Sequence, residues 1–235
     1  MDKQRKEEFL AGLPEEWPDD LLPEIQQKVK ASGRKVVVLD DDPTGTQTVH
    51  STPVLTEWPV EALRAELAND LPAFYLLTNS RSWPLAEAEA MMVEIGHNLA
   101  EAARQADRGF VVVSRSDSTL RGHFPGEVSA LDETLGGDFD AWLIIPFFLE
   151  GGRYTIDDVH YVAEGEWLVP AGETEFARDA AFGYRASNLR HWVEEKTGGR
   201  VPAQSVSSIS IQDIRRGGPE RVAERLAGLA PGSVC

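Results

Sequence analysis

Residues 36–46 read Val36-Val37-Val38-Leu39-Asp40-Asp41-Asp42-Pro43-Thr44-Gly45-Thr46. Four apolar residues lead directly into three carboxylates and a Pro-Thr-Gly turn. A short apolar run bounded by turn residues is typical of a strand buried on both faces of a parallel sheet. Three consecutive acids exceed what a helix cap or a solvated turn requires. Because open α/β sheets bind ligands beyond the carboxyl ends of their strands, this stretch indicates a site as well as a strand.

From residue 34 onward, apolar strands alternate with helical segments. Strands are predicted at 35–39, 74–78, 109–114, 141–146 and 204–211, and helices at 60–69, 84–107, 124–135, 187–197 and 219–229. This alternation predicts an α/β fold with a doubly wound, mostly parallel sheet and helices on both faces. Residues 146–182 interrupt the alternation and predict an irregular insertion with a small hairpin.

The two ends of the chain carry further expectations. Residues 1–33 are predicted to form an N-terminal helical extension with helices at 3–13 and 19–30, and residues 34–235 to form one α/β domain. Val234 stands where the alternation predicts another strand, and the sequence ends at Cys235. Because a parallel strand needs neighbours, we expect a further segment or a partner chain to supply the rest of the architecture.

Composition narrows the class of protein. The net charge of −16 argues against nucleic acids and anionic membranes as partners. The single cysteine excludes a disulfide framework, and no histidine pair has metal-ligand spacing, so we expect no metal site in the chain. The N-terminus lacks the apolar core of a signal peptide, and no apolar run reaches membrane-spanning length. A cytoplasmic location is therefore expected.

Polar residues follow each predicted strand at its carboxyl end. They are Asp40 to Thr44, then Thr78-Asn79-Ser80-Arg81, then the decapeptide Ser114 to His123, and finally Gly151-Gly152-Arg153-Tyr154-Thr155. In a parallel sheet these loops would meet at one edge, where acids, arginines and hydroxyls suit a small, polyhydroxylated anion. A helix cap explains Asp117 or Ser118 but not a wholly polar decapeptide. For Arg81 and Arg153 taken singly, a surface salt bridge is an equal alternative.

The motifs that hold nucleotide phosphates are missing from the sequence. Neither a Gly-x-x-x-x-Gly-Lys-Ser/Thr loop nor a Gly-x-Gly-x-x-Gly after a strand occurs. After the first predicted strand, Lys196 is the only lysine. We therefore expect that the chain does not bind a nucleotide by itself.

Five motifs in order resemble those of the four-carbon acid sugar kinase family. They are Asp41-Asp42-Pro43-Thr44-Gly45, Thr78-Asn79-Ser80-Arg81, Asp117-Ser118-Thr119-Leu120-Arg121-Gly122, Gly152-Arg153-Tyr154-Thr155 with His160-Tyr161, and Glu175-Phe176-Ala177-Arg178-Asp179. The resemblance covers about residues 34–235 and implies the N-terminal, sugar-acid-binding domain alone. Asp40 and Arg115 depart from it, since many members have Ala and Lys there.

The resemblance implies a carbohydrate kinase in a truncated or split chain, of which this substrate domain would be catalytically inactive alone. ATP and Mg²⁺ would be its cofactors, held mainly by a C-terminal nucleotide-binding half that could act in trans; a homodimer is a further expectation. The catalytic candidates are Asp41, Asp42 and Asp117, any of which could orient the attacking hydroxyl or accept its proton. The substrate-binding candidates are Thr44, Gly45, Asn79, Arg81, Arg115, Ser118, Thr119, Arg121, Gly122 and Arg153.

Two other interpretations stay open. The Asp40-Asp41-Asp42-Pro43-Thr44 run also fits the first motif of haloacid-dehalogenase-like phosphatases, with Asp40 as nucleophile, Asp42 as acid/base and Mg²⁺ between them. That chemistry also needs a lysine and a later acidic pair, for which only Lys196 and Asp213 are available. Alternatively, the chain is a sugar-acid-binding module without turnover, or half of a split kinase.

Overall fold

The computed structural model describes residues 3–137 and 139–235, and the chain divides into two compact units. Unit 1 comprises Met1–Pro18, Ser118–Arg121 and Phe139–Cys235. Unit 2 comprises Asp19–Asp117 and Gly122–Asp138. The domain boundaries expected from the sequence stay a prediction, because this division follows contacts within the chain rather than its order.

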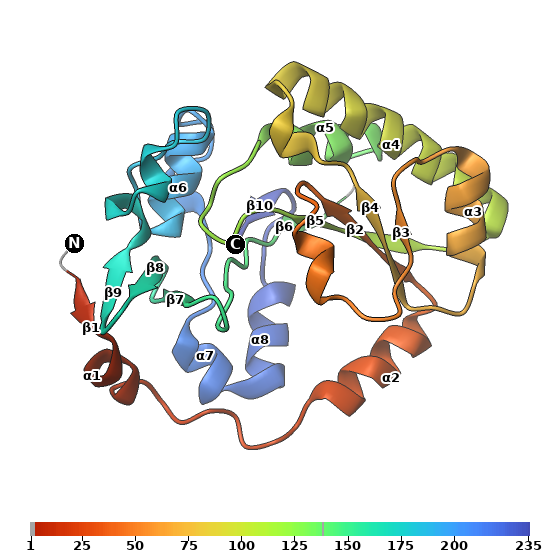
Figure 1. Cartoon of the computed structure of the whole chain (residues 1–235). Coiled ribbons are helices and arrows are strands. Elements are labelled where there is room, and N and C mark those ends of the chain that lie inside the picture. The colour runs from red at the N-terminus through yellow and green to blue at the C-terminus, as the bar shows by residue number, and fades with distance from the viewer. Residues whose placement is uncertain (1–2, 138) are drawn as a thin grey trace. The chain divides into compact units, whose positions relative to one another are not determined.

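Unit 2 is built on a four-stranded parallel sheet in the order β3-β4-β2-β5 (Figure 1). The strands are β3 (Val54–Leu55), β4 (Ala73–Leu77), β2 (Lys35–Asp40) and β5 (Phe110–Arg115). At the centre, Val37 lies opposite Phe74 on one side and Val112 on the other. The predicted fold class, an α/β protein with a mostly parallel sheet, is confirmed.

Three helices pack on one face of this sheet: α3 (Val60–Ala68), α4 (Leu85–Ala106) and α5 (Gly126–Thr134). Alternate strand residues point into the shared core, and α4 contributes residues at helical spacing. The buried members are Val37, Leu39, Phe74 and Leu76 from the strands and Leu63, Leu67, Met92, Ile95, Leu99, Ala102 and Leu131 from the helices. The strands and these helices therefore share one hydrophobic core. The helix α2 (Leu22–Ser32) also belongs to unit 2 and has no buried residue.

A buried lysine holds the other end of the sheet. Lys35, at the start of β2, is fully buried, and its Nζ donates 2.8 Å hydrogen bonds to the backbone and side-chain oxygens of Asn69. Burial lowers the pKa of Lys35, and the nearby charge of Arg108 lowers it further. The amine thus ties the start of β2 to the turn between α3 and β4.

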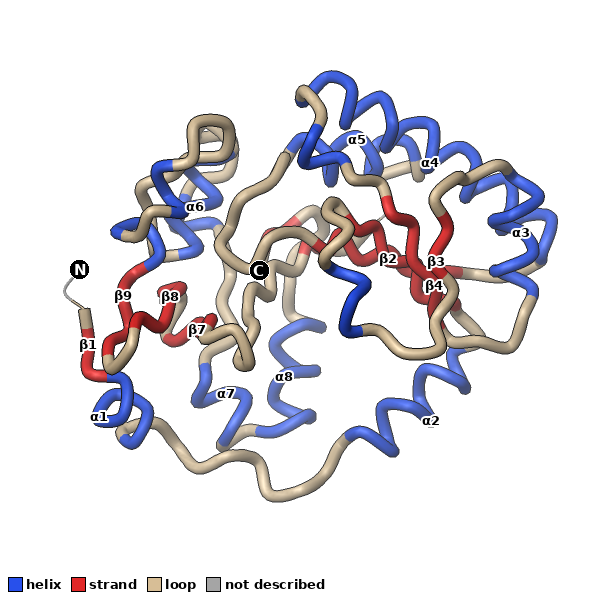
Figure 2. Tube along the Cα trace, viewed as in Figure 1, coloured by secondary structure: helices blue, strands red, loops and turns tan. Residues whose placement is uncertain are grey.

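Unit 1 contains an antiparallel sheet in the order β1-β9-β8-β7 (Figure 2). The strands are β1 (Gln4–Arg5), β9 (Trp167–Pro170), β8 (Val159–Glu164) and β7 (Arg153–Ile156). The helix α1 (Lys6–Ala11) follows β1 and packs Phe9 edge-on against Tyr161, with 5.7 Å between ring centroids. The expected hairpin is present, and it is part of a larger sheet that the N-terminus completes.

In the rest of unit 1, one strand predicted from the sequence is present and another is not. Ser233–Val234 form β10, which pairs in parallel with β6 (Ala141–Trp142), so the strand expected at Val234 exists. These two strands form a separate sheet. The strand predicted at 204–211 is wrong. Ser210 accepts a hydrogen bond from the Asp213 N–H at 3.1 Å, and the Asp213 carboxylate accepts one from the Ser210 N–H at 3.0 Å. This capping box starts a helix.

Three helices complete unit 1: α6 (Leu189–Lys196), α7 (Ile211–Arg215) and α8 (Gly218–Ala227).

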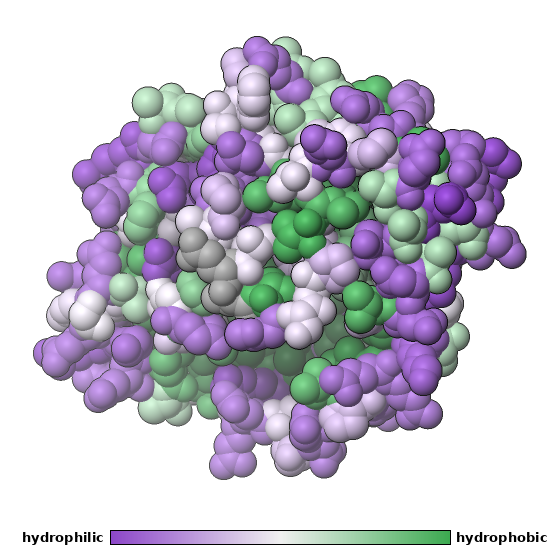
Figure 3. Space-filling model, turned by 45° about the vertical axis from the view of Figure 1, so that its right-hand side comes forward, coloured by the Kyte–Doolittle hydropathy of each residue, from purple (hydrophilic) through white to green (hydrophobic). Residues whose placement is uncertain are grey.

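Hydrophilic residues predominate on the face drawn in Figure 3, with smaller hydrophobic areas between them. None of the helices in the described ranges is both long and apolar enough to cross a lipid bilayer.

Candidate functional site

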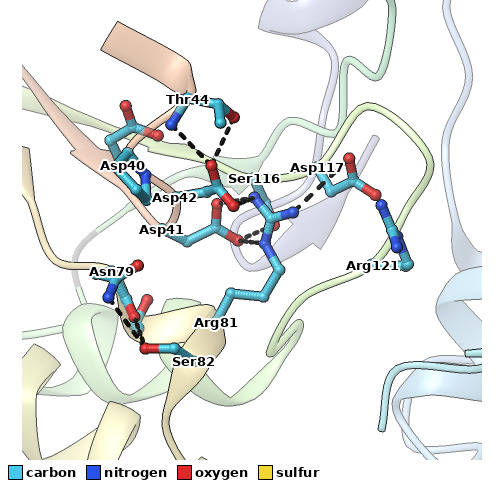
Figure 4. A network of polar contacts seen from close by, with 12 residues as sticks. Asp40, Asp41, Asp42, Thr44, Asn79, Arg81, Ser82, Ser116, Asp117 and Arg121 are labelled. Carbon is cyan, nitrogen blue, oxygen red and sulfur yellow. Dashed lines mark hydrogen bonds and ion pairs between the residues drawn. The ribbon is translucent and has the colours of Figure 1, made fainter. Parts of the chain in front are cut away.

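The site lies in unit 2, where three parallel strands end side by side. Asp40, the last residue of β2, lies opposite Leu77 at the end of β4 and Arg115 at the end of β5. The residues that follow these strands are therefore brought together, as expected for the carboxyl edge of a parallel sheet. Figure 4 shows Asp41 and Asp42 turned toward Arg81, with Asp117 nearby, whereas the Asp40 side chain points the other way.

Arg81 is the centre of the polar cluster. Its Nη2 lies 2.8 Å from Asp41 Oδ1 and 3.4 Å from Asp42 Oδ2, and its Nη1 lies 3.9 Å from Asp117 Oδ1. Its Nε also donates to Asp41 Oδ2 at 3.2 Å, which makes the contact with Asp41 bidentate. Burial alone would lower the pKa of Arg81, but the hydrogen bond and charge of Asp41, with the charges of Asp117 and Asp42, raise it. The guanidinium is thus a permanent cation among three acids.

The side chain of Asp41 is held in place by hydrogen bonds from Arg81 and Ser116. Its carboxylate is almost fully buried and accepts, besides the two Arg81 bonds, a 2.7 Å hydrogen bond from the Ser116 hydroxyl. Gly122 lies directly against this hydroxyl. A Cβ added to Gly122 would lie only 2.3 Å from Ser116 Oγ, so a larger residue there would clash with it. The φ of Gly122 is +142°, a region that favours glycine. Asp41 stays a predicted catalytic residue, but these contacts favour a positioning role.

Asp42 is the more accessible carboxylate. Its side chain is 28% exposed, and its Oδ1 accepts hydrogen bonds from the Thr44 N–H at 2.8 Å and the Thr44 hydroxyl at 2.5 Å. The Thr44 hydroxyl lowers the pKa of Asp42, and the charges of Arg81 and Arg115 lower it further. Asp42 therefore remains ionised at neutral pH and can accept a hydrogen bond from a ligand hydroxyl.

Asp40 and Arg115 form a second ion pair beside the cluster. Asp40 is fully buried, and Arg115 Nη1 donates to its Oδ1 at 3.1 Å. Burial raises the pKa of Asp40, and the charge of Arg115 opposes that effect. A phosphatase nucleophile must reach the phosphorus atom. With no exposed surface, Asp40 does not fit that role.

Asn79 shapes the turn that carries Arg81. It has a left-handed φ of 51°, its backbone N–H donates to Asp40 O at 3.3 Å, and its side chain donates to Ser82 Oγ at 3.1 Å. Left-handed backbone is a conformation that Asn tolerates better than most residues. Its contacts therefore serve the turn itself.

Four of the predicted substrate-binding residues belong to unit 1. Ser118 O is bonded at 2.8 Å to His160 Nε2, and Thr119 O accepts a 2.7 Å bond from the Tyr184 hydroxyl. Arg121 Nη1 lies 3.7 Å from Asp179 Oδ2. The guanidinium groups of Arg121 and Arg153 both lie over the ring of Phe176, at 5.1 and 5.4 Å from its centroid. Their roles toward a ligand stay predictions.

Sequence reasoning missed two contributors in unit 2, Ser116 and Glu127. Glu127 is in the first turn of α5, is 93% buried and is hydrogen-bonded to the Ser80 side chain. Ser80 is fully buried and lies 3.1 Å from Thr78 Oγ1, which in turn donates to Asp40 O at 3.0 Å. This chain of hydroxyl groups connects α5 to the ends of β2 and β4.

Comparison with known proteins identifies the family. Residues 36–234 match the family model described as "Sugar-binding N-terminal domain", which is most of the chain. The chain belongs to this family. The resemblance expected from the five motifs is thereby confirmed. No curated protein matches the sequence significantly.

Solved structures share the fold of this sugar-binding domain. Two are crystal forms of a protein from Bordetella bronchiseptica, described as a domain of unknown function (DUF1537) with bound citrate and as a domain-swapped dimer. They are 22% and 24% identical, with TM-scores of 0.59 and 0.58, over 85% and 86% of this chain. A Haemophilus influenzae protein of the DUF1537 family is 19% identical over 84% of this chain, with a TM-score of 0.56.

These similarities establish the fold of the sugar-binding domain rather than its ligand, because all three identities are below 25%. The matches cover 46%, 48% and 47% of the solved chains. The present chain therefore spans about half the length of the structures it resembles.

Proposed function

We propose that this chain is the substrate-binding part of an ATP-dependent kinase that phosphorylates a four-carbon acid sugar such as threonate or erythronate. The observation that carries this proposal is the polar cluster at the edge of the unit 2 sheet, where Asp41, Asp42 and Asp117 surround Arg81. The family assignment supports a sugar as the ligand.

Asp42 is the most exposed carboxylate of the cluster and the one best placed to meet a ligand. Asp42 is ionised, partly exposed and held in one orientation by Thr44, so it can accept a hydrogen bond from a sugar hydroxyl. Phosphoryl transfer requires above all that the attacking hydroxyl is positioned in line with the phosphate. Asp42 and Asp117 would orient this hydroxyl, while Asp41 keeps Arg81 in place.

We place the binding of Mg²⁺ and ATP outside this chain as part of the proposal. Among the described residues, no group of three or more carboxylate, imidazole or thiol side chains is arranged to hold a metal ion. The proposal therefore assigns ATP and Mg²⁺ to a C-terminal nucleotide-binding part, in the same polypeptide or in trans.

The Bordetella protein supports a small organic acid as the ligand class. Its structure is described with bound citrate, which carries carboxylates and a hydroxyl on a short carbon skeleton. A four-carbon sugar acid has the same combination of groups. We propose that this chain also binds a small hydroxylated organic acid, without proposing that the acid is citrate.

Thermal unfolding with separate ligands tests the proposal. A ligand that binds only the native state raises the midpoint, by about 2.7 kcal/mol of added stability at a hundred times its Kd. We expect a rise with threonate or erythronate and none with ATP·Mg²⁺. No rise with any sugar acid would contradict the proposal, and Mg²⁺-dependent hydrolysis of p-nitrophenyl phosphate would support the phosphatase instead.

A matched pair of variants tests whether the rise in thermal midpoint comes from a ligand bound at the polar cluster. Asp42→Asn removes the charge of the exposed site carboxylate, and we expect it to reduce the shift with sugar acids. Glu94→Gln makes the same change of charge at an exposed position of α4, away from the strand ends. It should leave the shift unchanged.

We also propose a homodimer for this chain. The Bordetella protein is described as a domain-swapped dimer. In this chain, Leu143, Ile145 and Phe147 of unit 1 are 49%, 71% and 61% exposed, and clustered exposed apolar side chains are typical of interaction surfaces. Light scattering at low and high protein concentration should give twice the mass of the chain; a monomer at both would refute the dimer.

A further inference from the structure

We propose that Arg115 is the residue that receives the carboxylate of the ligand, and that the buried Asp40 holds it in position for this. The proposal rests on the proposed function, because it names the group in the unit 2 site that distinguishes a sugar acid from a neutral sugar. It also separates the roles of Arg81 and Arg115, which the sequence leaves equivalent.

Arg81 is poorly placed to bind a ligand carboxylate. Three carboxylates already lie within 4 Å of its guanidinium, at 2.8, 3.4 and 3.9 Å, and its side chain is only 17% exposed. A fourth carboxylate would be repelled by the first three, and these exceed the single positive charge of Arg81. The Arg81 cluster therefore favours neutral hydrogen-bond donors, which in a sugar acid are the hydroxyl groups.

Arg115 has the opposite environment. Among the described side chains its ion pair is with one carboxylate, that of Asp40, through Nη1 at 3.1 Å, and 37% of its side chain is exposed. A guanidinium carries five N–H donors in a planar fork that matches a carboxylate with two parallel bonds. The remaining donors of Arg115 can therefore serve a second carboxylate that approaches from solvent.

Asp40 and Gly45 keep this guanidinium in place. Asp40 is fully buried, so its carboxylate cannot follow the arginine into solvent. A Cβ added to Gly45 would lie 2.3 and 2.4 Å from the two Asp40 oxygens and 2.4 Å from Arg115 Nη1. The backbone at Gly45 thus covers the ion pair directly, which explains why a glycine is needed there.

The two groups that would hold a sugar acid belong to the same strand end, because Arg115 contacts Asp40, and Asp42 follows Asp40 in the same turn. The Thr44 hydroxyl is the main cause of the lowered pKa of Asp42, and the charge of Arg115 is among the further causes. Arg115 therefore lies within electrostatic reach of Asp42. A short ligand with a carboxylate at one end and hydroxyls along its chain would place the carboxylate on Arg115 and a hydroxyl on Asp42.

Calorimetric titration with threonate and with threitol, its neutral analogue with CH₂OH in place of the carboxylate, tests the proposal. We expect the wild-type chain to prefer threonate by about tenfold or more, as for a charge-assisted contact. Arg115→Gln should bind threonate as weakly as threitol. Arg104→Gln, an exposed arginine on α4, makes the same change of charge and should keep the preference.

Two further variants keep the test decisive. If Arg115→Gln does not fold, Arg115→Lys should bind threonate about threefold or more weakly, because an ammonium lacks the fork. Asp40→Asn should weaken threonate binding by about threefold while leaving threitol binding unchanged, because Arg115 loses its charged partner and is no longer held in position for the ligand carboxylate. A purely structural role of Asp40 would weaken both ligands equally.

The outcomes separate this inference from the proposed function. If the wild-type chain binds threonate and Arg115→Gln keeps its preference over threitol, the role of Arg115 is refuted while sugar-acid binding stands. If the wild-type chain binds neither sugar acids nor threitol, both proposals are overturned.

Discussion

Glu127 is a buried acid next to the site. Burial raises the pKa of Glu127, whereas the Ser80 hydrogen bond and the charge of His123 oppose the rise. Asp41 raises it further and Arg81 lowers it, so the two site residues act on Glu127 in opposite directions. Its carboxyl group is thus sensitive to the state of the cluster that it supports.

The raised pKa gives a pH dependence of known sign. An acid that holds its proton more tightly in the folded state stabilises the fold fully below its unfolded pKa, near 4.3, and loses this contribution as pH rises through the folded pKa. We expect Glu127→Gln to remove that part of the pH dependence, because the amide stays neutral and can still bond Ser80. Urea unfolding at pH 4.5 and pH 8 measures the difference.

Glu127→Ala is the companion variant. It leaves the buried Ser80 hydroxyl without this partner and opens space, which should cost roughly 1–3 kcal/mol of unfolding free energy at both pH values. Equal pH dependence in the wild type and Glu127→Gln would show that Glu127 does not change its protonation on unfolding.

At the residue scale, the sequence predicted the charged groups but not their partners. Asp41, Asp42 and Arg81 were predictable because each follows a recognisable apolar strand. Ser116 is an ordinary serine in a polar loop, and nothing local distinguishes the buried Glu127 from Glu133, the exposed glutamate on the same helix. Both residues contribute to the site through contacts with residues far away in the sequence, and a local sequence pattern cannot predict such contacts.

At the scale of elements, the local sequence pattern predicted helices and strands correctly where one face of the element is apolar. The five helices predicted after residue 34 exist because the helical spacing of their apolar residues agrees with their packing, and Asn188 also caps the start of α6. The strand expected at 204–211 failed because a 3-10 turn occupies Ala203–Ser205 and the capping box of Ser210 and Asp213 starts α7 at Ile211. The β1 strand was not predictable, since two residues, Gln4 and Arg5, pair with β9, which lies more than 160 residues further along.

The N-terminal elements yield a prediction of stability. Phe9, Leu10 and Leu13 pack against the core of the unit 1 sheet, and Phe9 meets Tyr161 edge to face. Because Phe9 is half-buried, Phe9→Ala should cost about 1–2 kcal/mol, less than for a fully buried ring. Chemical denaturation measures this loss.

Leu22→Ala on α2 is the control for Phe9. Leu22 is also apolar and near the N-terminus, but it is 57% exposed in unit 2. Its replacement should change stability by less than about 0.5 kcal/mol. Equal effects of the two substitutions would mean that α1 is not an integral part of the unit 1 sheet.

At the scale of the whole molecule, the net charge of −16 sets the response to salt. Like charges spread over a compact chain repel one another and favour unfolding. The Debye length falls from about 30 Å at 0.01 M to about 8 Å at 0.15 M ionic strength, so NaCl should screen this repulsion. We expect the thermal midpoint to rise by a few degrees over this range, since roughly 1 kcal/mol corresponds to about 2–4 °C at this size.

The buried ion pairs should respond much less than the surface charges. Arg81 and Asp41 lie largely out of solvent, and Asp40 is fully buried beside the partly exposed Arg115, so salt screens these pairs weakly. Chloride is the appropriate salt, because sulfate stabilises proteins by exclusion from their surface, and an uncharged solute at matched concentration is the control. A midpoint that falls with NaCl would mean that attractive surface pairs, such as Arg104 with Glu101, outweigh the net repulsion. The fold would then depend on how its charges are arranged rather than on their sum.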